Sequence, residues 1–439
     1  MTYFALVDCN NFFVSCERAV DPALQNKPVV VLSNNDGCIV SRSQEAKALG
    51  IRMGEPYFKI KGELNRKKVR VISSNFNLYT RKSEQVMQVL AQFTPQLEVY
   101  SIDEAFLQLD ALSVPVLREL GRDIRQAVLR ETRIPVSLGL AETRTRAKLA
   151  NAIAKKNLRF EGVLNLVHSP HWDMILTRTP VGRVWGVGRN LLKSLSNAGI
   201  TTARALRDAD DRWLLKRFNV TLLRTVLELR GISCISLQRK AMRHSVMYTR
   251  SFGQLITQQP QLESAVAGFA AHAGEKLREE GMVAGHMTVY FRTSRHIGTE
   301  AMYSACGETR LLTPTACTQD LIQAALTVTR QIFKPGYGYY KAGIILRELA
   351  PCEERQMSLF ETRDLDRLDR LTRTLDDINR AFGAGTLQYA VEGLEKPWLS
   401  RRNNLSEAGL AACLSSQKAN HSEPSQHRPM IGFVHPVHG

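Results

Sequence analysis

Alternation of short apolar runs with helix-like segments over the first 166 residues constrains this chain more than any other feature. Four runs are apolar and rich in β-branched residues, as buried strands are: 2–10, 27–34, 97–110 and 134–142. Four other segments have the residue pattern of helices: 41–50, 81–93, 115–132 and 143–157. Strands interleaved with helices predict an α/β or α+β core.

The rest of the chain changes character three times. From about residue 168 the sequence consists of short helical segments separated by glycine turns. After a basic linker at 237–250, residues 250–347 follow the order strand, helix, strand, strand, helix, strand, which suits a small sheet with two helices on one side. From 406 onward there is so little periodicity that we expect disorder.

Charge indicates the class of partner. Lys and Arg total 59 against 42 Asp and Glu, which gives a formal net charge of +17. A protein this basic usually binds a polyanion, most often nucleic acid, and an enzyme with a basic surface is the alternative. The N-terminus lacks the basic region of a signal peptide, no apolar run approaches the ~20 residues of a membrane span, and the eight cysteines form no Cys-x-x-Cys pair. These features predict a cytoplasmic protein.

Two adjacent acids, Asp103 and Glu104, interrupt the strand pattern of 97–110. In a regular strand one of them would face a core, where a bare carboxylate is costly, whereas a tight turn or strand end would let both reach one site. Asp8 also ends a strand, so three carboxylates converge on one sheet edge if the two strands are neighbours. Such hard oxygen ligands suit Mg²⁺ and a two-metal phosphoryl transfer. Taken alone, the pair is better explained as two solvated turn acids, and Asp8 at the end of an apolar strand in a basic protein shifts the balance toward a metal site.

Six separated motifs resemble, in order and spacing, those of the Y-family translesion DNA polymerases: ALVDCNNFFVSCE, KPVVVLSNNDGCIVSRSQEAKALGI, SSNFNLYTR, YSIDEAFLQL, VSLGLAETRTRAKLANAIAKK and VWGVGRNLLKSL. LSNNDGCIVSR and RSFG are similar to the UmuC branch, which comprises the catalytic subunit of DNA polymerase V and its plasmid-borne relatives. The resemblance covers about residues 3–400. It implies an α+β right-hand polymerase with palm, fingers, a helical thumb containing a helix-hairpin-helix, and a separate little-finger domain of sheet plus two helices.

The resemblance also implies where these domains begin and end. The expected boundaries are 1–11 and 76–166 for the palm, 12–75 for the fingers, 167–236 for the thumb, 243–350 for the little finger, and 351–439 for a C-terminal region with a clamp-binding peptide and the disordered tail.

Catalytic and metal-binding residues follow from the same resemblance. Asp8, Asp103 and Glu104 would be the catalytic acids and would hold two Mg²⁺ ions, with the backbone carbonyl of Cys9 as a further ligand. The expected reaction is attack of a primer 3′-hydroxyl on the α-phosphate of a dNTP, with pyrophosphate as the leaving group.

Substrate-binding residues also carry over. Lys155 would bind the dNTP triphosphate, and Lys47 stands where many relatives have an arginine with that role. Gln44 replaces a tyrosine common in the family. Phe13 would be the steric gate that crowds a ribose 2′-hydroxyl; on the residues alone, plain core packing is the preferred interpretation.

DNA contacts are expected in two places. WGVGR resembles the hairpin of a helix-hairpin-helix, in which small turn residues let backbone N–H groups approach a phosphate. An ordinary helix turn is the alternative, which the nearby basic residues make less favourable. With the basic linker, the expected DNA-binding set is Gly186, Gly188, Arg189, Lys193, Arg239, Lys240 and Arg243.

Protein partners are implied by the tail and by the resemblance. RQMSLFE at 355–361 resembles the bacterial sliding-clamp-binding pentapeptide, with Gln356, Leu359 and Phe360 as anchors. A clamp tether raises effective concentration at the primer end. The UmuC resemblance further implies a UmuD′-like dimer and a RecA filament, acting in the SOS response of a bacterium.

The sequence therefore predicts a Mg²⁺-dependent, error-prone DNA polymerase that copies past lesions on primer-template DNA. A two-metal nuclease fits less well, because hydrolysis needs neither a triphosphate site nor a sugar gate. A catalytically weak DNA-binding accessory subunit tethered to the clamp is the remaining alternative, although it has no need of all three acids.

Overall fold

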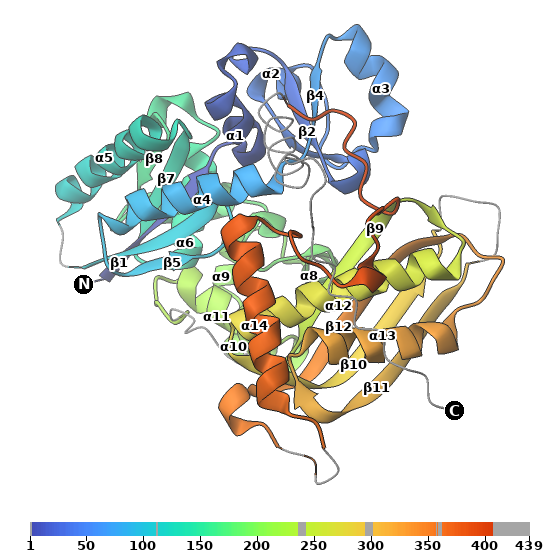
Figure 1. Cartoon of the computed structure of the whole chain (residues 1–439). Helices are drawn as coiled ribbons and strands as arrows, with labels where there is room; N and C mark the ends of the chain where they lie inside the picture. Colours follow the sequence, from blue (N-terminus) through green and yellow to red (C-terminus); the bar gives the residue numbers. More distant parts are fainter. Residues whose placement is uncertain are drawn as a thin grey trace. The chain divides into compact units, whose positions relative to one another are not determined.

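The computed structural model describes residues 2–110, 113–235, 243–294, 302–356, 358 and 362–406. It forms two compact units, the first made of Met1–Val31 and Cys38–Arg239 and the second of Leu32–Gly37 and Lys240–Gly439 (Figure 1). Both units combine sheets with helices, which confirms the predicted α+β class. Within the described ranges, every helix is too short or too polar to cross a lipid bilayer.

The first unit is built around a five-stranded sheet with the order β5-β6-β1-β7-β8. β1 pairs antiparallel with both β6 and β7, and β7 pairs in parallel with β8. A smaller sheet has the order β3-β2-β4. The strands are β1 (Thr2–Cys9), β2 (Val29–Leu32), β3 (Ile39–Arg42), β4 (Arg70–Ser73), β5 (Leu97–Val99), β6 (Glu104–Asp110), β7 (Val136–Ala141) and β8 (Val163–Asn165).

Helices α1 to α6 of the first unit alternate with these strands along the chain, and α7 to α11 follow β8. Its α-helices are α1 (Phe12–Val20), α2 (Gln44–Ala48), α3 (Tyr57–Arg66), α4 (Phe76–Ala91), α5 (Val114–Thr132), α6 (Arg144–Ala154), α7 (Trp172–Arg178), α8 (Arg189–Asn197), α9 (Ala203–Arg207), α10 (Asp211–Arg217) and α11 (Val220–Leu229). Single 3₁₀ turns are η1 (Pro22–Leu24), η3 (Leu158–Phe160) and η4 (Val181–Arg183).

Two predicted helices begin elsewhere because of their N-caps. The segment 41–50 starts as strand β3, and α2 begins only after Ser43, whose hydroxyl accepts the N–H of Ala46. The helix predicted at 81–93 begins five residues earlier as α4, because Asn75 caps it by accepting the N–H of Leu78. The elements exist as predicted, and their first turns are set by side-chain caps.

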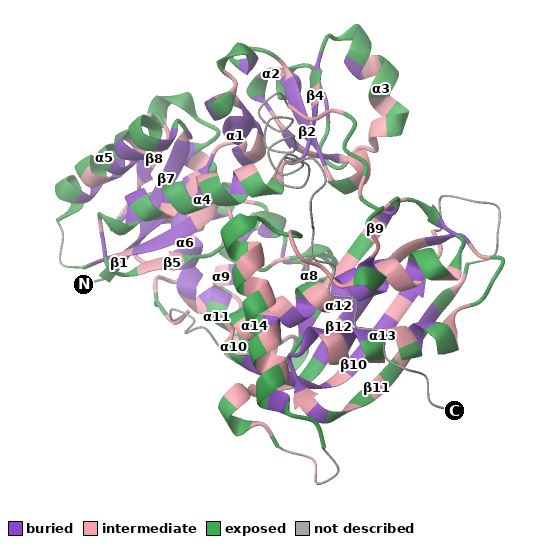
Figure 2. Ribbon diagram, viewed as in Figure 1, coloured by how far each residue is buried: buried purple, intermediate pink, exposed green. Residues whose placement is uncertain are grey.

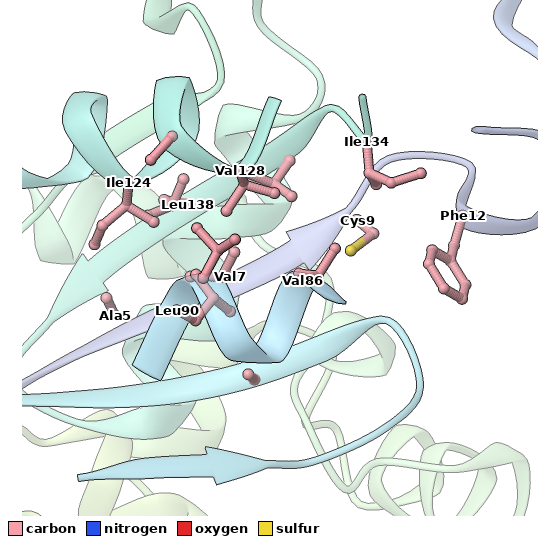
Figure 3. Packing of buried hydrophobic residues seen from close by; sticks show 14 of the residues in the cluster. Ala5, Val7, Cys9, Phe12, Val86, Leu90, Ile124, Val128, Ile134 and Leu138 are labelled. Carbon is pink, nitrogen blue, oxygen red and sulfur yellow. The ribbon is translucent and has the colours of Figure 1, made fainter. Parts of the chain in front are cut away.

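Both faces of β1 are buried, and they pack against different layers. Val7 and Cys9 belong to a hydrophobic cluster that α4 and α5 complete (Figure 3). Phe4 and Leu6 belong to a second cluster with residues of α6 and of the helices after β8. Side chains alternate along a strand, so Asp8 lies on the α6 side of the sheet.

The second unit contains a four-stranded sheet in the order β11-β10-β12-β9, with α12 and α13 packed on it (Figures 1 and 2). The predicted order of strands and helices over 250–347 is confirmed. The elements are η2 (Asn34–Asp36), β9 (Val246–Ile256), α12 (Gln259–Glu279), β10 (Met282–Arg292), β11 (Ser304–Thr315), α13 (Thr318–Ile332), β12 (Tyr339–Pro351), η5 (Cys352–Glu354), α14 (Leu365–Phe382) and η6 (Ala390–Glu392).

The C-terminal region continues this unit as an ordered element that the sequence analysis did not foresee. Helix α14 is held by Arg278 of α12, which donates to both carboxylate oxygens of Asp376 at 2.6 and 2.7 Å. Further on, Trp398 is 7% exposed and packs into the core of the unit. The tail expected to be disordered lies, from 407 onward, outside the described residues.

A short loop from the predicted fingers also belongs to the second unit. The carboxamide of Asn35 donates to the carbonyls of Ser251 and Phe252 in β9 and accepts the N–H of Arg401 at 2.9 Å. Both Asn35 and Asp36 have positive φ, a backbone conformation that this network stabilises. The C-terminal segment thus packs on two separate parts of the chain within its own unit.

Candidate active site

Three acids meet at one end of the five-stranded sheet. Asp8, the last residue but one of β1, is the direct register partner of Glu104, the first residue of β6. Asp103 precedes Glu104, and its carbonyl accepts the N–H of Cys9 at 2.8 Å. The strands that carry the acids are therefore neighbours, and the backbones of all three acids lie at the same end of the sheet.

A tight turn between β5 and β6 explains how two adjacent acids serve one site. The hydroxyl of Ser101 donates to Oδ1 of Asp103 at 2.7 Å and accepts the N–H of Glu104 at 3.0 Å. The N–H groups of Tyr100 and Ser101 both donate to the carbonyl of Glu104 at 3.0 Å. The regular strand begins only at Glu104, so neither acid has to enter a core.

Two lysines, one in α6 and one at its C-cap, form ion pairs with two of these acids. Lys155 forms an ion pair with Asp8, and Lys148 donates to Oε2 of Glu104 at 2.9 Å. Burial raises the pKa of Asp8 to about 7, and Lys155 opposes this rise while Glu104 adds to it. Burial also acts to raise the pKa of Glu104, but hydrogen bonds from Lys148 and Asp8 outweigh it and leave that pKa below its usual value. The negative charge of Asp8 and Glu104 is thus offset by cations in direct contact with them.

The donor chemistry fits a hard divalent cation. Carboxylate oxygens from Asp8, Asp103 and Glu104 are the ligands that Mg²⁺ prefers. Burial raises the pKa of the Cys9 thiol well above its usual value, so this thiol stays protonated and Cys9 can offer only its backbone carbonyl. In the described part of the chain, no three acidic, histidine or cysteine side chains already stand grouped around one point. Lysine ammonium groups instead contact Asp8 and Glu104 directly.

A basic cavity of about 580 Å³ lies beside Asp8's partner Lys155. Lys47 of α2 lines the same cavity, and its ammonium donates to the side-chain carbonyl of Asn11. Burial lowers the pKa of Lys47, and the charges of Arg42 and Lys155 lower it further. The two predicted triphosphate-binding lysines are therefore close enough to repel each other, as cations that share one polyanion do. Gln44, Arg125, Lys156 and Glu161 also line this cavity.

The predicted gate, Phe13, sits in an aromatic cluster on α1 and α4. Its ring stacks on Tyr79, with centroids 4.5 Å apart and planes at 15°, and meets Phe76 edge-on at 5.8 Å. Tyr79 is fully buried and its hydroxyl donates to Glu17 at 2.7 Å. Phe13 is not among the residues that line the basic cavity, although Asn11, two positions earlier, is. The ring contacts with Tyr79 and Phe76 fix the position of the Phe13 ring on α1.

A second cavity, of about 650 Å³, is lined by Asp8 itself. Its lining includes the two paired acids, Asp8 and Glu104, and the two lysines that bind them, Lys148 and Lys155. The remaining polar and aromatic lining comes from the region leading into the predicted hairpin and includes Lys156, Arg178, Arg183 and Trp185. Lys155 and Lys156 line both cavities, whereas Asp8 lines only the second one.

The WGVGR segment forms a tight turn between η4 and α8. Gly186 has φ of +86°, which L side chains rarely adopt, and Gly188 is the N-cap residue of α8. Both glycines and the side chains of Arg189 and Lys193 are exposed. The geometry leaves this turn open to solvent, where a phosphate could approach the backbone.

The other predicted contacts are less well placed. Arg243 is paired with Glu280 at 3.0 Å, which offsets its charge. Gln356 is exposed. Arg239, Lys240, Leu359 and Phe360 lie outside the described residues.

Sequence reasoning assigned no role to two residues that shape the site. Ser101 organises the acidic turn, and its position three residues before Glu104 is a signal for such a turn. Lys148 looked like an ordinary surface lysine, because nothing in the sequence shows that α6 crosses the end of β6.

Known proteins similar to this chain cover nearly all of it. Residues 7–152 match the impB/mucB/samB family, residues 243–359 match the C-terminal domain of that family, and residues 369–409 match a domain of unknown function, DUF4113. Protein UmuC of Salmonella typhimurium is 41% identical over 92% of this chain and 96% of its own length. Protein MucB of Escherichia coli is 37% identical with the same coverage.

More distant proteins share the architecture. DNA polymerase IV of Bacillus anthracis is 27% identical over 89% of this chain and 93% of its own length. Among solved structures, the Y-family DNA polymerase chimera Dbh-Dpo4(243-245)-Dbh superposes with a TM-score of 0.62 at 19% identity, covering 79% of this chain and 98% of the chimera. At that identity the match establishes the fold alone.

Proposed function

This chain belongs to the impB/mucB/samB family of Y-family DNA polymerases, and on that premise we propose that it is an error-prone, DNA-directed DNA polymerase for translesion synthesis in the SOS response. One observation carries the assignment to this site. Asp8 and Glu104 face each other in register and line one cavity, and Lys155, paired with Asp8, lines both this cavity and the one that contains Lys47. Acids that line one cavity and share a lysine with a second, basic cavity suit the joining of two polyanions.

The proposed reaction is attack of the primer 3′-hydroxyl on the α-phosphate of a dNTP. Asp8, Asp103, Glu104 and the carbonyl of Cys9 would hold two Mg²⁺ ions, which when bound supply Lewis-acid activation and neutralise charge at the transferring phosphoryl group. Lys47 and Lys155 bind and orient the triphosphate in the 580 Å³ cavity. Phe13, held by Tyr79, excludes a 2′-hydroxyl. Catalysis by the chain's own residues is then mainly positioning.

Domain roles follow the same proposal. The five-stranded sheet would be the palm, at 1–11 and 76–166, with the fingers at 12–75 and the thumb at 167–236. The second unit would contain the little finger at 243–350, followed by the C-terminal region 351–439. The exposed Gly186–Gly188 turn, Arg189 and Lys193 would contact DNA phosphates, with Arg239, Lys240 and Arg243 in the linker.

Partners are proposed from the family and from the tail sequence. Primer-template DNA and dNTP are the substrates that the basic cavities support. A sliding clamp would bind 355–361 through Gln356, Leu359 and Phe360, and a UmuD′-like dimer and a RecA filament would assemble with the enzyme. These partners place its work in the bacterial cytoplasm.

Primer extension tests the proposal. Full-length protein is assayed with Mg²⁺ on undamaged and abasic templates, with and without clamp and UmuD′-like dimer. We expect extension by the wild type and a loss of at least about a hundredfold in Asp103→Ala/Glu104→Ala. Asp110→Ala, an exposed acid at the opposite end of β6, is the control and should extend normally.

The alternative function makes a different prediction. If folded wild-type protein bound primer-template DNA but extended no primer under any of these conditions, the chain would be a DNA-binding accessory subunit. The melting temperature of the double variant shows whether its loss of activity reflects unfolding.

A further inference from the structure

The ammonium of Lys148 is held by three groups at once. It donates to Oε2 of Glu104 at 2.9 Å, and it lies 4.3 Å from the ring centroid of Tyr100 and 5.2 Å from that of Trp185. A cation within about 6 Å of an aromatic face is attracted to it, so the two rings form a second holding site beside the carboxylate. Lys148 would therefore keep its place if Glu104 found another partner.

The two rings are fixed to each other and to the sheet. The indole N–H of Trp185 donates to the hydroxyl of Tyr100 at 3.1 Å, and the rings meet edge-on at 5.5 Å. Both contact Phe106 of β6, two residues beyond Glu104. Trp185 immediately precedes the Gly186–Gly188 turn, so this aromatic group joins the proposed DNA-binding hairpin to the acidic end of β6.

Lys148 lines the 650 Å³ cavity and not the 580 Å³ cavity in which we place the triphosphate. It lines the 650 Å³ cavity together with Arg178 and Arg183, whereas Lys47 lines the 580 Å³ cavity. If the triphosphate occupies the cavity of Lys47, the primer end has to approach the acids from the other cavity. The phosphate nearest the primer 3′-hydroxyl then enters the chamber that contains Lys148.

Charge balance gives Lys148 a reason to change partners. In the free protein Lys148 and Glu104 neutralise each other, with side chains 23% and 19% exposed. Cations that bind the carboxylate of Glu104 leave the ammonium without its anion, and a half-buried ammonium without an anion is unfavourable. A phosphodiester of the primer is the anion that the proposed reaction brings to this chamber.

We propose that Lys148 is a primer-binding residue, released from Glu104 when cations occupy the carboxylate and then bonded to the last internucleotide phosphate of the primer while Tyr100 and Trp185 hold it in place. This role rests on the proposed polymerase function and adds a primer contact to it. Lys148 would align the 3′-hydroxyl without touching the nucleotide.

A thermodynamic cycle tests the contact directly. The affinity of full-length protein for primer-template DNA is measured by fluorescence anisotropy without nucleotide, in Ca²⁺ and in EDTA. The primer carries either ordinary linkages or one neutral methylphosphonate at its last linkage, and the protein is wild type or Lys148→Met. In Ca²⁺ we expect the neutral linkage to weaken wild-type binding at least about tenfold, as for one charge-assisted hydrogen bond, and to have no effect on Lys148→Met.

The cycle has internal controls. Lys148→Arg should restore the sensitivity to the neutral linkage, and Lys61→Met, an exposed lysine of α3, should bind like wild type. In EDTA the wild type should show little sensitivity, because Glu104 retains Lys148. Glu104→Gln should restore the sensitivity even in EDTA, which makes the test independent of metal.

Two results would overturn the proposal. Equal sensitivity of wild type and Lys148→Met in Ca²⁺ would show that Lys148 only neutralises Glu104. If the methylphosphonate is moved to the second or third linkage and the coupling becomes larger there, Lys148 lies away from the primer end. Failure of the polymerase function is distinguishable, because it appears as lack of extension by the wild type, whereas the cycle measures binding alone.

Discussion

Gly139 in the middle of β7 controls how closely α6 approaches the sheet. Its replacement by alanine should displace α6 and, with it, the lysines that pair with Asp8 and Glu104. A Cβ at this position would lie 2.1 Å from the backbone N of Asn151 and 2.3 Å from the carbonyl oxygen of Ala147, both in α6. The carboxamide of Asn151 fixes the same approach by donating to the carbonyls of Leu6 and Ser137 at 3.3 and 2.7 Å. Backbone atoms cannot turn aside as a flexible side chain can, so the helix has to move.

The required movement follows from the contact distance. Ordinary van der Waals contact begins near 3.4 Å, so the helix must shift by about 1.3 Å to relieve the 2.1 Å contact. Helix α6 carries Lys148, and Lys155 follows at its C-cap, so both acids' partners move with it. Misplacement by about 1 Å can cost a hundredfold in rate. Overpacking of this kind also costs about 3 kcal/mol of folding free energy, which corresponds to about 6–12 °C in melting temperature.

The assay compares Gly139→Ala with Gly62→Ala. Nothing lies within 4 Å of a Cβ at Gly62, which is inside helix α3. That substitution should stabilise the protein by about 0.5–1 kcal/mol and leave primer extension unchanged. Melting temperature and kcat for extension are measured for both variants. Differences of about 2 °C in melting temperature and about twofold in kcat are on the order of experimental error. If Gly139→Ala differed from the wild type by no more than this, the close approach of α6 would not control the site.

Two further substitutions test the gate and a buried acid. Phe13→Ala should reduce the preference for dNTP over rNTP, measured as the ratio of kcat/KM values, by at least about tenfold, because the ring that stacks on Tyr79 is removed; an unchanged ratio would contradict the gate role. Burial raises the pKa of Glu392, which is 6% exposed, so the folded state loses stability as pH rises from the unfolded pKa near 4.5 through the higher folded pKa. Glu392→Gln should therefore gain stability over wild type in urea unfolding at pH 8 and gain less at pH 5; an equal difference at both pH values would rule out this titration.

The sequence identified the acids of the site, but it predicted that they lie together only if the two strands that carry them are neighbours. Asp8 at a strand end and Asp103–Glu104 in a broken strand pattern are visible in the sequence. That β1 and β6 are neighbours is a matter of strand order, which depends on contacts nearly a hundred residues apart. Local patterns specify strands, whereas the packing of whole layers decides which strands pair.

Helix α14 shows a signal that was present and overlooked. Leu365, Leu368, Leu371, Leu375 and Ile378 recur at spacings of three and four, the period of an amphipathic helix. High charge between these positions made the segment look like a polar tail. The charges are part of its docking, since Asp376 takes both hydrogen bonds from Arg278, and that pairing depends on α12, about a hundred residues earlier.

The lysines of α6 show why site chemistry could not be derived from spacing alone. Lys148 and Lys155 are seven residues apart, so any helix places them on one face. Whether α6 meets the acids depends on which face of the sheet Asp8 occupies. Asp8 lies on the same face as Phe4 and Leu6, which α6 covers. A shift of one residue along β1 would turn Asp8 toward α4 and α5. The depth of α6 on that face is then set by Gly139. The face of β1 on which Asp8 lies and the absence of a side chain at Gly139 thus determine which lysines reach the acids. Gly139 is therefore as necessary to this site as the charged residues themselves.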